Sequence, residues 1–541
     1  MGSMKTPGVY IIEKNAFPNS VVEAPTAIPA FIGYTERAVN GNDDLTNVPW
    51  KISSMTEYIQ YFGGGPDLKF EVDIKDGSLC IEGKNSYTLY YNMMLFFANG
   101  GGACYIVSVG SYKDALKKDS MITGLGKLTL EQEITLVAIP EAVNLSSSEE
   151  FKDIQQQMLS HCGNTMKNRF ALLDIYPKAN EKTKIEDQVN FFCDNIGSSF
   201  LSYGAAYFPW LNTSIVGERD LKGDMFTWTD NAYIHRTQLD AGFAEIVESL
   251  FVEEFEIKEN VVKNGHTFKL EEVVEGDIYA DSDTEKTKVI GRIESIKDIK
   301  EDGNEEVIKK NVKVVWLFPN NVDKQALHQA LYNVSSVYKQ AIKGVLKNLN
   351  LFPPSAAMAG IYTMVDNSRG VWKAPANVTL NYVGSTVEDI DDEQQADLNT
   401  PTHGKAVNVI RLFRGEGVKV WGARTLDGNS LDWRYVNVRR TLLFLEESIK
   451  NAARAYVFEP NDAGTWINMK CMIDSFLRSV WKRGGLAGAT PEDAFEVHIG
   501  LGDTMTAEDI LDGIMRITVL VAVTHPAEFI EITFQQQAQK S

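Results

Sequence analysis

Strand-like runs alternate with helical segments between residues 100 and 210, and this order constrains the fold of the 541-residue chain most strongly. The runs have strand length and are rich in β-branched and aromatic residues, which is typical of buried strands. In order, the predicted strands are Cys104 to Val109, Ile134 to Ile139, Phe170 to Ile175 and Leu201 to Phe208. Between the second and third strands lies a helix that a capping box of Ser147 and Glu150 opens, and between the third and fourth lies a helix from Ile185 to Ile196. This alternation predicts an α/β layer with a partly parallel sheet.

The composition excludes several classes of partner. Lys and Arg number 53 against 73 Asp and Glu, a net charge of −20, so the summed field repels phosphate backbones and anionic lipid, and we expect no nucleic acid partner. The five cysteines never have C-x-x-C spacing, which argues against a disulfide framework or a zinc ribbon. No run approaches the roughly 20 apolar residues of a membrane span, and no secretory signal is visible. We therefore expect that the protein folds in the cytoplasm and does not insert directly into a membrane.

No residue pattern indicates catalysis. The chain lacks P-loop, zincin, serine hydrolase and dinucleotide-binding motifs, and its seven histidines are scattered. One acidic cluster could hold a hard cation, but it lacks the EF-hand spacing and its central glycine, which favours a solvated loop; it comprises Asp389, Asp391, Asp392, Glu393 and Asp397. We predict no catalytic, cofactor or metal site, and keep a metal-dependent enzyme that uses this cluster as the alternative of another class.

The remainder of the chain changes character several times. Residues 245–315 are highly charged and punctuated by glycines between short alternating runs, which predicts a β-rich surface insertion. A single long helix follows, from Ala326 to Leu346, with Asn320 or Asn321 as its candidate cap. Beyond Gly370 we predict the strands Val407 to Phe413, Val418 to Gly422 and Arg516 to Val523, and the helices Arg434 to Arg454 and Gly464 to Arg483.

Each end of the chain holds a strand-like run without a neighbour. Val9 to Ile12 lies between Pro7-Gly8 and a series of prolines, and Phe529 to Gln535 follows the break at Pro526. A lone strand cannot bury its own faces, so each must pair with a sheet elsewhere, in this chain or in another. These orphan strands are a first indication of assembly.

Several segments together resemble the sheath proteins of contractile tails, from bacteriophages and from phage-tail-like contractile injection systems. In the first half these segments are TPGVYIIE, FPNSVVEAPTAIPAFIGYT, FFANGGGACYIVSVG, LVAIP, ALLDIYP and AAYFPWL. In the last third they are GVWKAPAN, VWGARTL, WRYVNVRRTLLFLEESI, FEPND, TWINMKCMIDSFLRSVWKRGGLAGATPEDAF and VTHPAEFIEITFQ, in the order that the family has. Residues 245–315 match nothing in the family, which leaves the role of this insertion open.

The resemblance implies a mixed α/β, multidomain subunit whose C-terminal α/β core is completed by strands exchanged between subunits. It divides the chain into an N-terminal arm (1–26), an outer α/β region (27–244), the β-rich insertion (245–315), a long helix and connector (316–369), the C-terminal core (370–525) and a C-terminal arm (526–541). The donor strands implied by the family are Val9, Tyr10, Ile11 and Ile12 at one end and Phe529, Ile530, Glu531, Ile532, Thr533 and Phe534 at the other. Bends near Pro18 and Pro526 would let the bodies move while the arms stay paired.

The family's function follows from this architecture. Its subunits stack as sixfold rings around an inner tube, and the sheath contracts from a metastable extended state, driving the tube through a target envelope. The resemblance therefore implies a structural protein, not an enzyme, without cofactors, assembled in the bacterial cytoplasm into a released or membrane-anchored particle. Its implied partners are further copies of itself, the inner tube protein, and baseplate and terminal cap proteins. An injection system is favoured, with the tail sheath of an infectious phage as the alternative.

The helix Gly464 to Arg483 carries the implied tube contact. It has an apolar stripe and a cationic side in an acidic protein, a pattern that by itself equally fits a core helix with cations near its C-terminal end. By motif position it corresponds to the family's tube-facing helix. The candidate tube contacts are Lys470, Arg478, Lys482 and Arg483.

Overall fold

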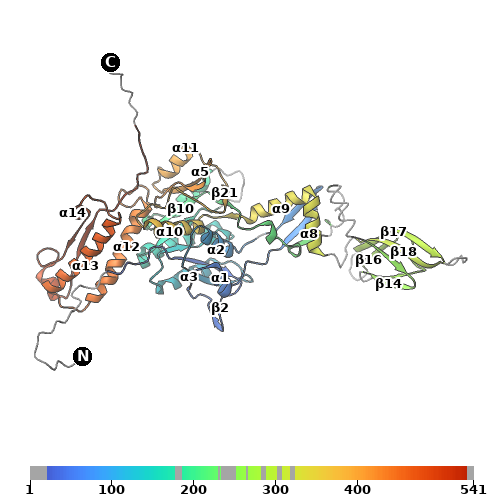
Figure 1. Cartoon of the computed structure of the whole chain (residues 1–541), viewed down its shortest axis with the longest axis horizontal. Coiled ribbons are helices and arrows are strands. Elements are labelled where there is room, and N and C mark those ends of the chain that lie inside the picture. The colour runs from blue at the N-terminus through green and yellow to red at the C-terminus, as the bar shows by residue number, and fades with distance from the viewer. Residues whose placement is uncertain are drawn as a thin grey trace, which may run out of the picture. The chain divides into compact units, whose positions relative to one another are not determined.

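The computed structural model describes residues 21–83, 85–176, 185–229, 232, 240, 251–263, 266–281, 288–300, 307–316 and 323–532 (Figure 1). The chain divides into two compact units. The first contains the described residues of Met1–Gly65, Tyr87–Asn212 and Phe352–Ser541, and the second those of Pro66–Ser86 and Thr213–Leu351. The boundary between the units, at Leu351 and Phe352, falls within residues 316–369, which we predict as a single segment of long helix and connector.

A mixed sheet of nine described strands forms the centre of the first unit, in the order β20-β23-β22-β10-β9-β8-β1-β7-β4. All pairings from β7 to β22 are parallel, and the pairings β4–β7, β22–β23 and β23–β20 at the two ends of the sheet are antiparallel. The strands are β1 (Pro29–Thr35), β4 (Trp50–Ile52), β7 (Cys104–Ser111), β8 (Leu136–Ala138), β9 (Phe170–Asp174), β10 (Gly204–Phe208), β20 (Val378–Thr379), β22 (Val407–Phe413) and β23 (Gly417–Val420). The predicted mixed α/β fold with a partly parallel sheet is confirmed.

Helices cover both faces of this sheet, which is why its central strands are buried along their whole length. Ile32 packs in the hydrophobic core that includes the buried side chains of α3, α4 and α5. Its neighbour Phe31 points to the opposite face and meets Phe96 of α2, with ring centroids 5.0 Å apart. The helices of this layer are α1 (Met55–Phe62), α2 (Leu89–Ala98), α3 (Lys118–Lys127), α4 (Ser148–Ser160), α5 (Ile185–Asn195) and α10 (Ser355–Arg369).

Ser147 caps α4 as predicted, although the predicted capping box is wrong in detail. The Ser147 hydroxyl accepts a hydrogen bond from the backbone N–H of Glu149, at 3.2 Å, and not from that of Glu150. Ser147 therefore caps α4 through the backbone N–H two residues after it, whereas a capping box uses the N–H three residues after the cap.

The C-terminal part of the first unit contains a second hydrophobic core. The long helices α12 (Val436–Ala453) and α13 (Ala463–Lys482) pack with the antiparallel pair β24 (Phe495–His498) and β25 (Thr518–Val521). Ile473, Leu477 and Val480 of α13 are completely buried in this core. The other elements of the first unit are β2 (Val39–Asn40), β3 (Asp43–Asp44), β21 (Val383–Thr386), α11 (Asp392–Asn399), α14 (Pro491–Ala494) and α15 (Ala507–Leu511).

The second unit shows that the predicted single long helix is wrong. Two helices replace it, α8 (Lys324–Val334) and α9 (Ser336–Leu349). Ser335 has extended backbone angles between them, and its hydroxyl caps α9 by accepting from Tyr338 N–H at 3.1 Å. Asp323 caps α8, and the predicted caps Asn320 and Asn321 lie outside the described residues. The apolar spacing continues through Ser335, so periodicity alone could not reveal the break.

Apart from two short 3₁₀ helices, Glu218–Asp220 and Gly223–Met225, the remaining described elements of the second unit are strands. The order β12-β5-β6 forms one sheet and β13-β18-β17-β16 another, while β14 and β15 form an antiparallel pair. Their bounds are β5 (Phe70–Lys75), β6 (Ser78–Glu82), β12 (Phe226–Trp228), β13 (Val252–Ile257), β14 (Asn260–Lys263), β15 (His266–Lys269), β16 (Ile278–Asp281), β17 (Lys288–Lys300) and β18 (Val307–Trp316). β11 (Leu211–Thr213) and β19 (Leu351–Phe352) lie where the chain changes unit. Strands β13 to β18 enclose a small core of their own around Phe268 and Trp316, as expected for a β-rich insertion.

Candidate functional site

The carboxyl edge of the central sheet, where doubly wound folds bind ligands, is filled by the chain's own acids. Glu141 is fully buried, and its carboxylate accepts from the backbone N–H groups of Tyr34 and Thr88 at 2.7 Å and of Leu89 at 3.2 Å. Asp174 is held in the same way by the N–H and hydroxyl of Ser355, at 2.9 and 2.5 Å. Burial raises the pKa of each acid to about 7, against the opposing effect of these hydrogen bonds. Both carboxylates hold the beginning of a helix, α2 or α10.

The predicted acidic cluster also has a structural use. Asp391 caps α11, accepting from Gln394 N–H at 2.8 Å, and exposed Asp392 forms an ion pair of 2.7 Å with Arg411. Within the described ranges, no group of three or more His, Cys, Asp or Glu side chains is arranged to hold a metal ion. The predicted solvated loop is wrong for most of this cluster, because Asp392, Glu393 and Asp397 lie on α11 and Asp391 is its N-cap.

In the part of the chain that the structure describes, no helix combines the length and the apolar character that crossing a bilayer requires.

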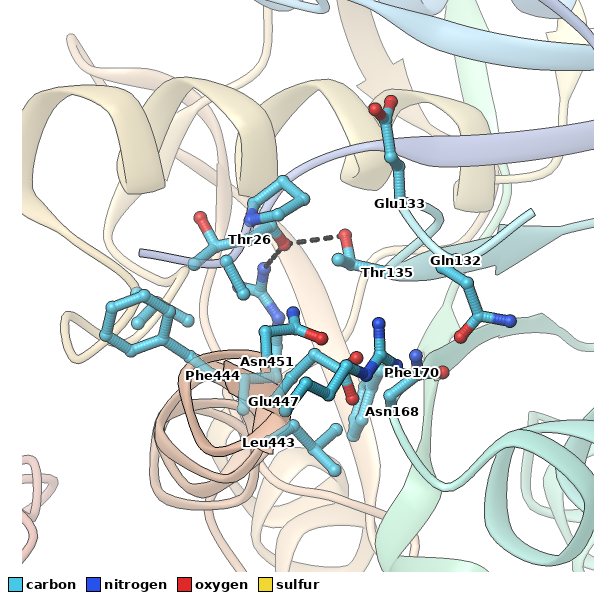
Figure 2. A pocket seen from close by; sticks show the side chains of 15 residues that line it. Thr26, Gln132, Glu133, Thr135, Asn168, Phe170, Leu443, Phe444, Glu447 and Asn451 are labelled. Carbon is cyan, nitrogen blue, oxygen red and sulfur yellow. Dashed lines mark hydrogen bonds between the residues drawn. The ribbon is translucent and has the colours of Figure 1, made fainter. Parts of the chain in front are cut away.

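The root of the N-terminal arm is attached to α12 and to the start of β8. The donor residues Val9, Tyr10, Ile11 and Ile12 lie outside the described residues. The backbone oxygen of Thr26 accepts from the Arg440 guanidinium and from the Thr135 hydroxyl, both at 2.8 Å (Figure 2). Ala24 N–H donates to the buried hydroxyl of Ser448 at 2.9 Å. This arm therefore leaves the body from a fixed point.

A cavity of about 230 Å³ lies beside this root (Figure 2). It is lined by apolar side chains such as Phe170, Leu443 and Phe444 and by amides and carboxylates such as Asn168 and Glu447. The lining contains no histidine or cysteine, so it offers no nucleophile paired with a base. We assign it no chemistry.

The C-terminal arm leaves the body as an extended, exposed segment (Figure 1). Residues 524–532 form no strand, and the side chains of Phe529, Ile530 and Ile532 are 76%, 78% and 70% exposed. The predicted donor residues Thr533 and Phe534 lie outside the described residues. Because side chains alternate along an extended chain, Ile530 and Ile532 share one face. Exposed apolar residues in such a row are typical of a segment that is buried against a partner.

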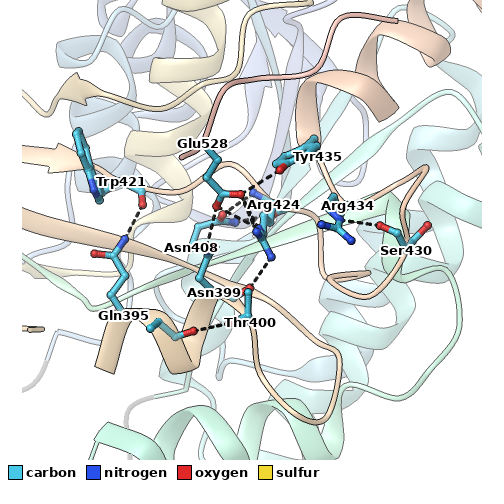
Figure 3. A network of polar contacts seen from close by, with 11 residues as sticks. Gln395, Asn399, Thr400, Asn408, Trp421, Arg424, Ser430, Arg434, Tyr435 and Glu528 are labelled. Carbon is cyan, nitrogen blue, oxygen red and sulfur yellow. Dashed lines mark hydrogen bonds and ion pairs between the residues drawn. The ribbon is translucent and has the colours of Figure 1, made fainter. Parts of the chain in front are cut away.

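Glu528 fixes the point from which this exposed segment departs (Figure 3). Its carboxylate accepts from the Arg424 guanidinium at 2.6 and 3.1 Å, from the Asn399 amide at 2.7 Å and from the Tyr435 hydroxyl at 3.1 Å. The Arg424 side chain is 4% exposed and that of Glu528 20%. The sequence predicts a bend near Pro526, and the chain is held by Glu528, two residues after this proline.

The environment of Glu528 favours its ionised form. Burial raises the pKa of this carboxyl, but the hydrogen bonds from Arg424, Asn399 and Tyr435 and the charge of Arg424 outweigh burial, so its pKa lies below the ordinary 4.5. A lowered pKa in the folded state means that the ionised carboxylate stabilises the fold.

We predict that this stabilisation disappears on acidification. With a lowered folded pKa, the contribution is fully present above pH 4.5 and is lost as the pH falls through the folded pKa. The urea midpoint of the unassembled wild-type protein should exceed that of Glu528→Gln at neutral pH, and the difference should shrink below pH 4.5. A difference between the two proteins that is the same at every pH would contradict the assignment.

The structure separates the four predicted tube contacts into two groups. Lys470, Arg478 and Lys482 are exposed on one face of α13, spaced by multiples of four residues, opposite the face that is buried in the core. Arg483 lies just beyond the helix, where it forms an ion pair with Glu23 and lies 5.3 Å from the ring centre of Trp372. Three of the four residues are therefore accessible on one side of α13, where Asp474 lies between Lys470 and Arg478, and Arg483 is engaged with the N-terminal arm root.

Sequence reasoning missed the residues that hold the arm roots. Arg424 and Glu528 both lie in segments that resemble the family, yet they are 104 residues apart in the chain. In the sequence, each is only a charged residue next to an apolar run, and such residues are common on any protein surface.

Comparison with known proteins shows which family the chain resembles. Residues 429–537 match the phage tail sheath C-terminal domain. The chain is 25% identical over 134 residues to a tail sheath protein of Vibrio phage KVP40, an alignment that covers 25% of this chain and 20% of that protein. It is 26% identical over 138 residues to the major tail sheath protein of Serratia phage KSP20, and this alignment covers 26% of this chain and 35% of that protein. These alignments thus span about a third or less of the curated relatives.

Solved structures resemble the whole chain. One belongs to the sheath complex of an extracellular contractile injection system, PVC, in the contracted state; it has 25% identity and a TM-score of 0.54 over 99% of both chains. Another, from the sixfold-symmetrised baseplate of the anti-feeding prophage, has 25% identity and a TM-score of 0.56 over 99% of this chain and 100% of that chain. The predicted resemblance is therefore confirmed: residues 429–537 match the C-terminal domain of phage tail sheaths, and the whole chain is similar in fold to contractile sheath structures.

Proposed function

We propose that this chain is the structural subunit of a contractile sheath, which polymerises as stacked sixfold rings around an inner tube and contracts to drive the tube through a target envelope. The observation that carries the proposal is the exposed apolar segment Phe529 to Ile532, which leaves a fixed root in a subunit with a sheath fold. Sedimentation velocity of the purified protein tests polymerisation. Fast, heterogeneous species support it, and a single 60.3-kDa species at every concentration and salt level would refute it.

Strand addition provides the link between subunits. Backbone hydrogen bonds give an added strand its affinity, and its alternate side chains fill pockets on the acceptor. The antiparallel pair β24 and β25 is a suitable acceptor, since a two-stranded sheet has two edges and Val519 and Val521 pack on its core without being fully buried. In this arrangement Ile530, Ile532 and Phe534 of a neighbouring copy extend the apolar layer. Val9 to Ile12 would do the same at the other arm.

The force for contraction comes from packing. Two arrangements of the same subunits that differ by a few kcal/mol per copy are sufficient to store the required free energy. The arms keep the copies joined while the bodies exchange one set of contacts for the other. The subunit therefore acts mechanically, as a structural protein.

The exposed face of α13 is the proposed contact with the inner tube. Lys470, Arg478 and Lys482 would meet an acidic tube surface. Exposed ion pairs contribute only about 0 to 1 kcal/mol each and are screened by salt. Such contacts suit a surface that must release the tube when the sheath contracts.

Charge reversal on this face should impair assembly on the tube and leave the subunit folded. The variant Arg478→Glu with Lys482→Glu replaces attraction by repulsion at exposed positions, so its urea midpoint should stay close to that of the wild type. Cosedimentation with tube protein should fall about tenfold or more. The matched control is Lys343→Glu with Lys347→Glu, an exposed pair at the same spacing on α9. Normal tube loading by the α13 variant would sink the assignment.

An injection system is the particle that we favour, because the full-length structural neighbours come from the PVC and anti-feeding prophage particles. The tail sheath of an infectious phage is the second candidate, supported by the relatives from Vibrio and Serratia phages. In either particle the subunit would be made in the bacterial cytoplasm and would join a baseplate and a terminal cap. Genes for a capsid and terminase beside this gene would indicate a phage, and genes for a spike and toxins an injection system.

A further inference from the structure

The roots of both arms are bound by one helix, α12, and the residues just before it. On the C-terminal side, the Tyr435 hydroxyl donates to Glu528, and the Asn437 amide donates to the backbone oxygen of Thr524 at 3.0 Å. Arg424 completes this contact with three hydrogen bonds to Glu528 and one, of 2.9 Å, to the backbone oxygen of Asn399. The root of the C-terminal arm is thus bonded through both its backbone, at Thr524, and a side chain, Glu528.

The same helix binds the N-terminal root a few residues later. Arg440 donates to the backbone oxygen of Thr26, and Ser448 accepts from the N–H of Ala24. Ser448 is fully buried and Arg440 is 4% exposed, so water competes poorly for these bonds. Both contacts come from side chains of α12, Val436–Ala453, and end on the backbone of the N-terminal arm root.

The helix is in turn fixed to the body of its unit. The Arg440 guanidinium makes two hydrogen bonds to the Asp366 carboxylate of α10, of 2.9 and 2.6 Å, and the side chains are 4% and 1% exposed. It also lies 4.6 Å from the ring centre of Tyr362 in the same helix. Since α10 contacts the central strands β8 and β9, a load on α12 reaches the sheet.

We propose that α12, together with Arg424, is a clasp that holds both arm roots and carries load from one arm to the other. The partners are two further copies of this chain, one joined to each arm, so the inference rests on the proposed function. A pull on the C-terminal arm enters α12 through Glu528 and Tyr435 and leaves through Arg440 and Ser448 to the N-terminal arm. The direct path between the two arms then runs through α12, and the Arg440–Asp366 pair passes part of the load on to the body of the first unit. Arg424, Arg440 and Ser448 are positioning residues, since they set where each donor strand begins.

The strength of the contacts fits this role. Hydrogen bonds to charged groups contribute more than neutral ones, and buried pairs are little affected by salt. The ion pair between Arg483 and Glu23 near the same root is over 40% exposed on both sides, so it adds little. The clasp therefore depends on its buried members.

The test compares Glu528→Gln with Glu531→Gln, the same substitution three residues further along the arm at an exposed position. A nitroxide label at Ala527→Cys, in a background with Cys80→Ser and Cys471→Ser, reports how firmly the root is held in unassembled protein. In Glu528→Gln the mobile fraction of the label should rise about tenfold, because a charge-assisted bond is lost, and in Glu531→Gln it should not change. Equal label mobility in both variants would overturn the inference.

Assembled rods test the transfer of load. After a fixed dose of shear, rods of Glu528→Gln should be several-fold shorter than rods of the wild type and of Glu531→Gln. Ser448→Ala, which removes the acceptor for Ala24, should shorten them likewise, against Ser475→Ala on the exposed side of α13 as control. Rods of equal length from all variants would contradict the clasp while leaving the sheath proposal intact. Failure of the wild type itself to form rods would instead remove the proposed function.

Discussion

Removal of the chain from Phe529 onward should leave a folded monomer that no longer forms rods. The deleted residues contribute no strand to their own subunit in the described range, and the three apolar side chains among them are at least 70% exposed. Their loss therefore costs the isolated fold almost nothing. In the polymer, the same deletion removes a complete row of backbone hydrogen bonds and the apolar face of the added strand at every copy. The Glu528 anchor is kept, so the arm root stays in place.

The matched control is a truncation from Gln535 onward, which keeps the whole run from Phe529 to Phe534. Circular dichroism and the urea midpoint report the fold of each variant, and electron microscopy reports rods. The shorter truncation should form rods of normal length, and the longer one none. Rods of normal length from both would show that the C-terminal strand does not link subunits.

Substitution of Asp366 by alanine should destabilise the first unit by about 3–5 kcal/mol, the usual cost of breaking a buried ion pair from one side. Its carboxylate is 1% exposed and is the partner of the Arg440 guanidinium, which would remain buried without a counter-charge. The side chain of Arg440 also holds Thr26, so the N-terminal root should loosen together with the loss of stability.

The urea midpoint of dilute, unassembled protein measures this effect. Asp392→Ala is the control, because it also breaks an aspartate–arginine pair, with Arg411, but the Asp392 side chain is 95% exposed. That variant should lose no more than about 1 kcal/mol. Similar midpoints for Asp366→Ala and the wild type would show that the buried pair does not support the fold as described.

Elements whose signals are local could be predicted from the sequence. The strand Val407–Phe413 has the predicted bounds, and the helix predicted from Gly464 to Arg483 is observed as Ala463–Lys482. A cap at its start, Asp462, and the glycines beyond its end mark this helix in the sequence itself. Ser335 shows the limit of periodicity, since the break it causes depends on backbone angles that the apolar spacing does not record.

Features that depend on distant pairs could not be predicted. Ala206 of β10 pairs with Val407 of β22, so strands of the predicted outer region and of the predicted C-terminal core join one sheet. The clasp is of the same kind, because Arg424 and Glu528 become partners only when the chain folds. For the tube face, helical spacing did place Lys470, Arg478 and Lys482 together, whereas the engagement of Arg483 by Glu23 required the position of the arm.

Negative-stain electron microscopy of the purified, full-length protein, at moderate and low salt and with and without the inner tube protein, tests the central claim most directly. We expect hollow rods of uniform width, with a wider lumen when the protein assembles alone than when it assembles around the tube, as two packings of one subunit require. Monodisperse globular particles that persist after addition of the tube protein would contradict the account.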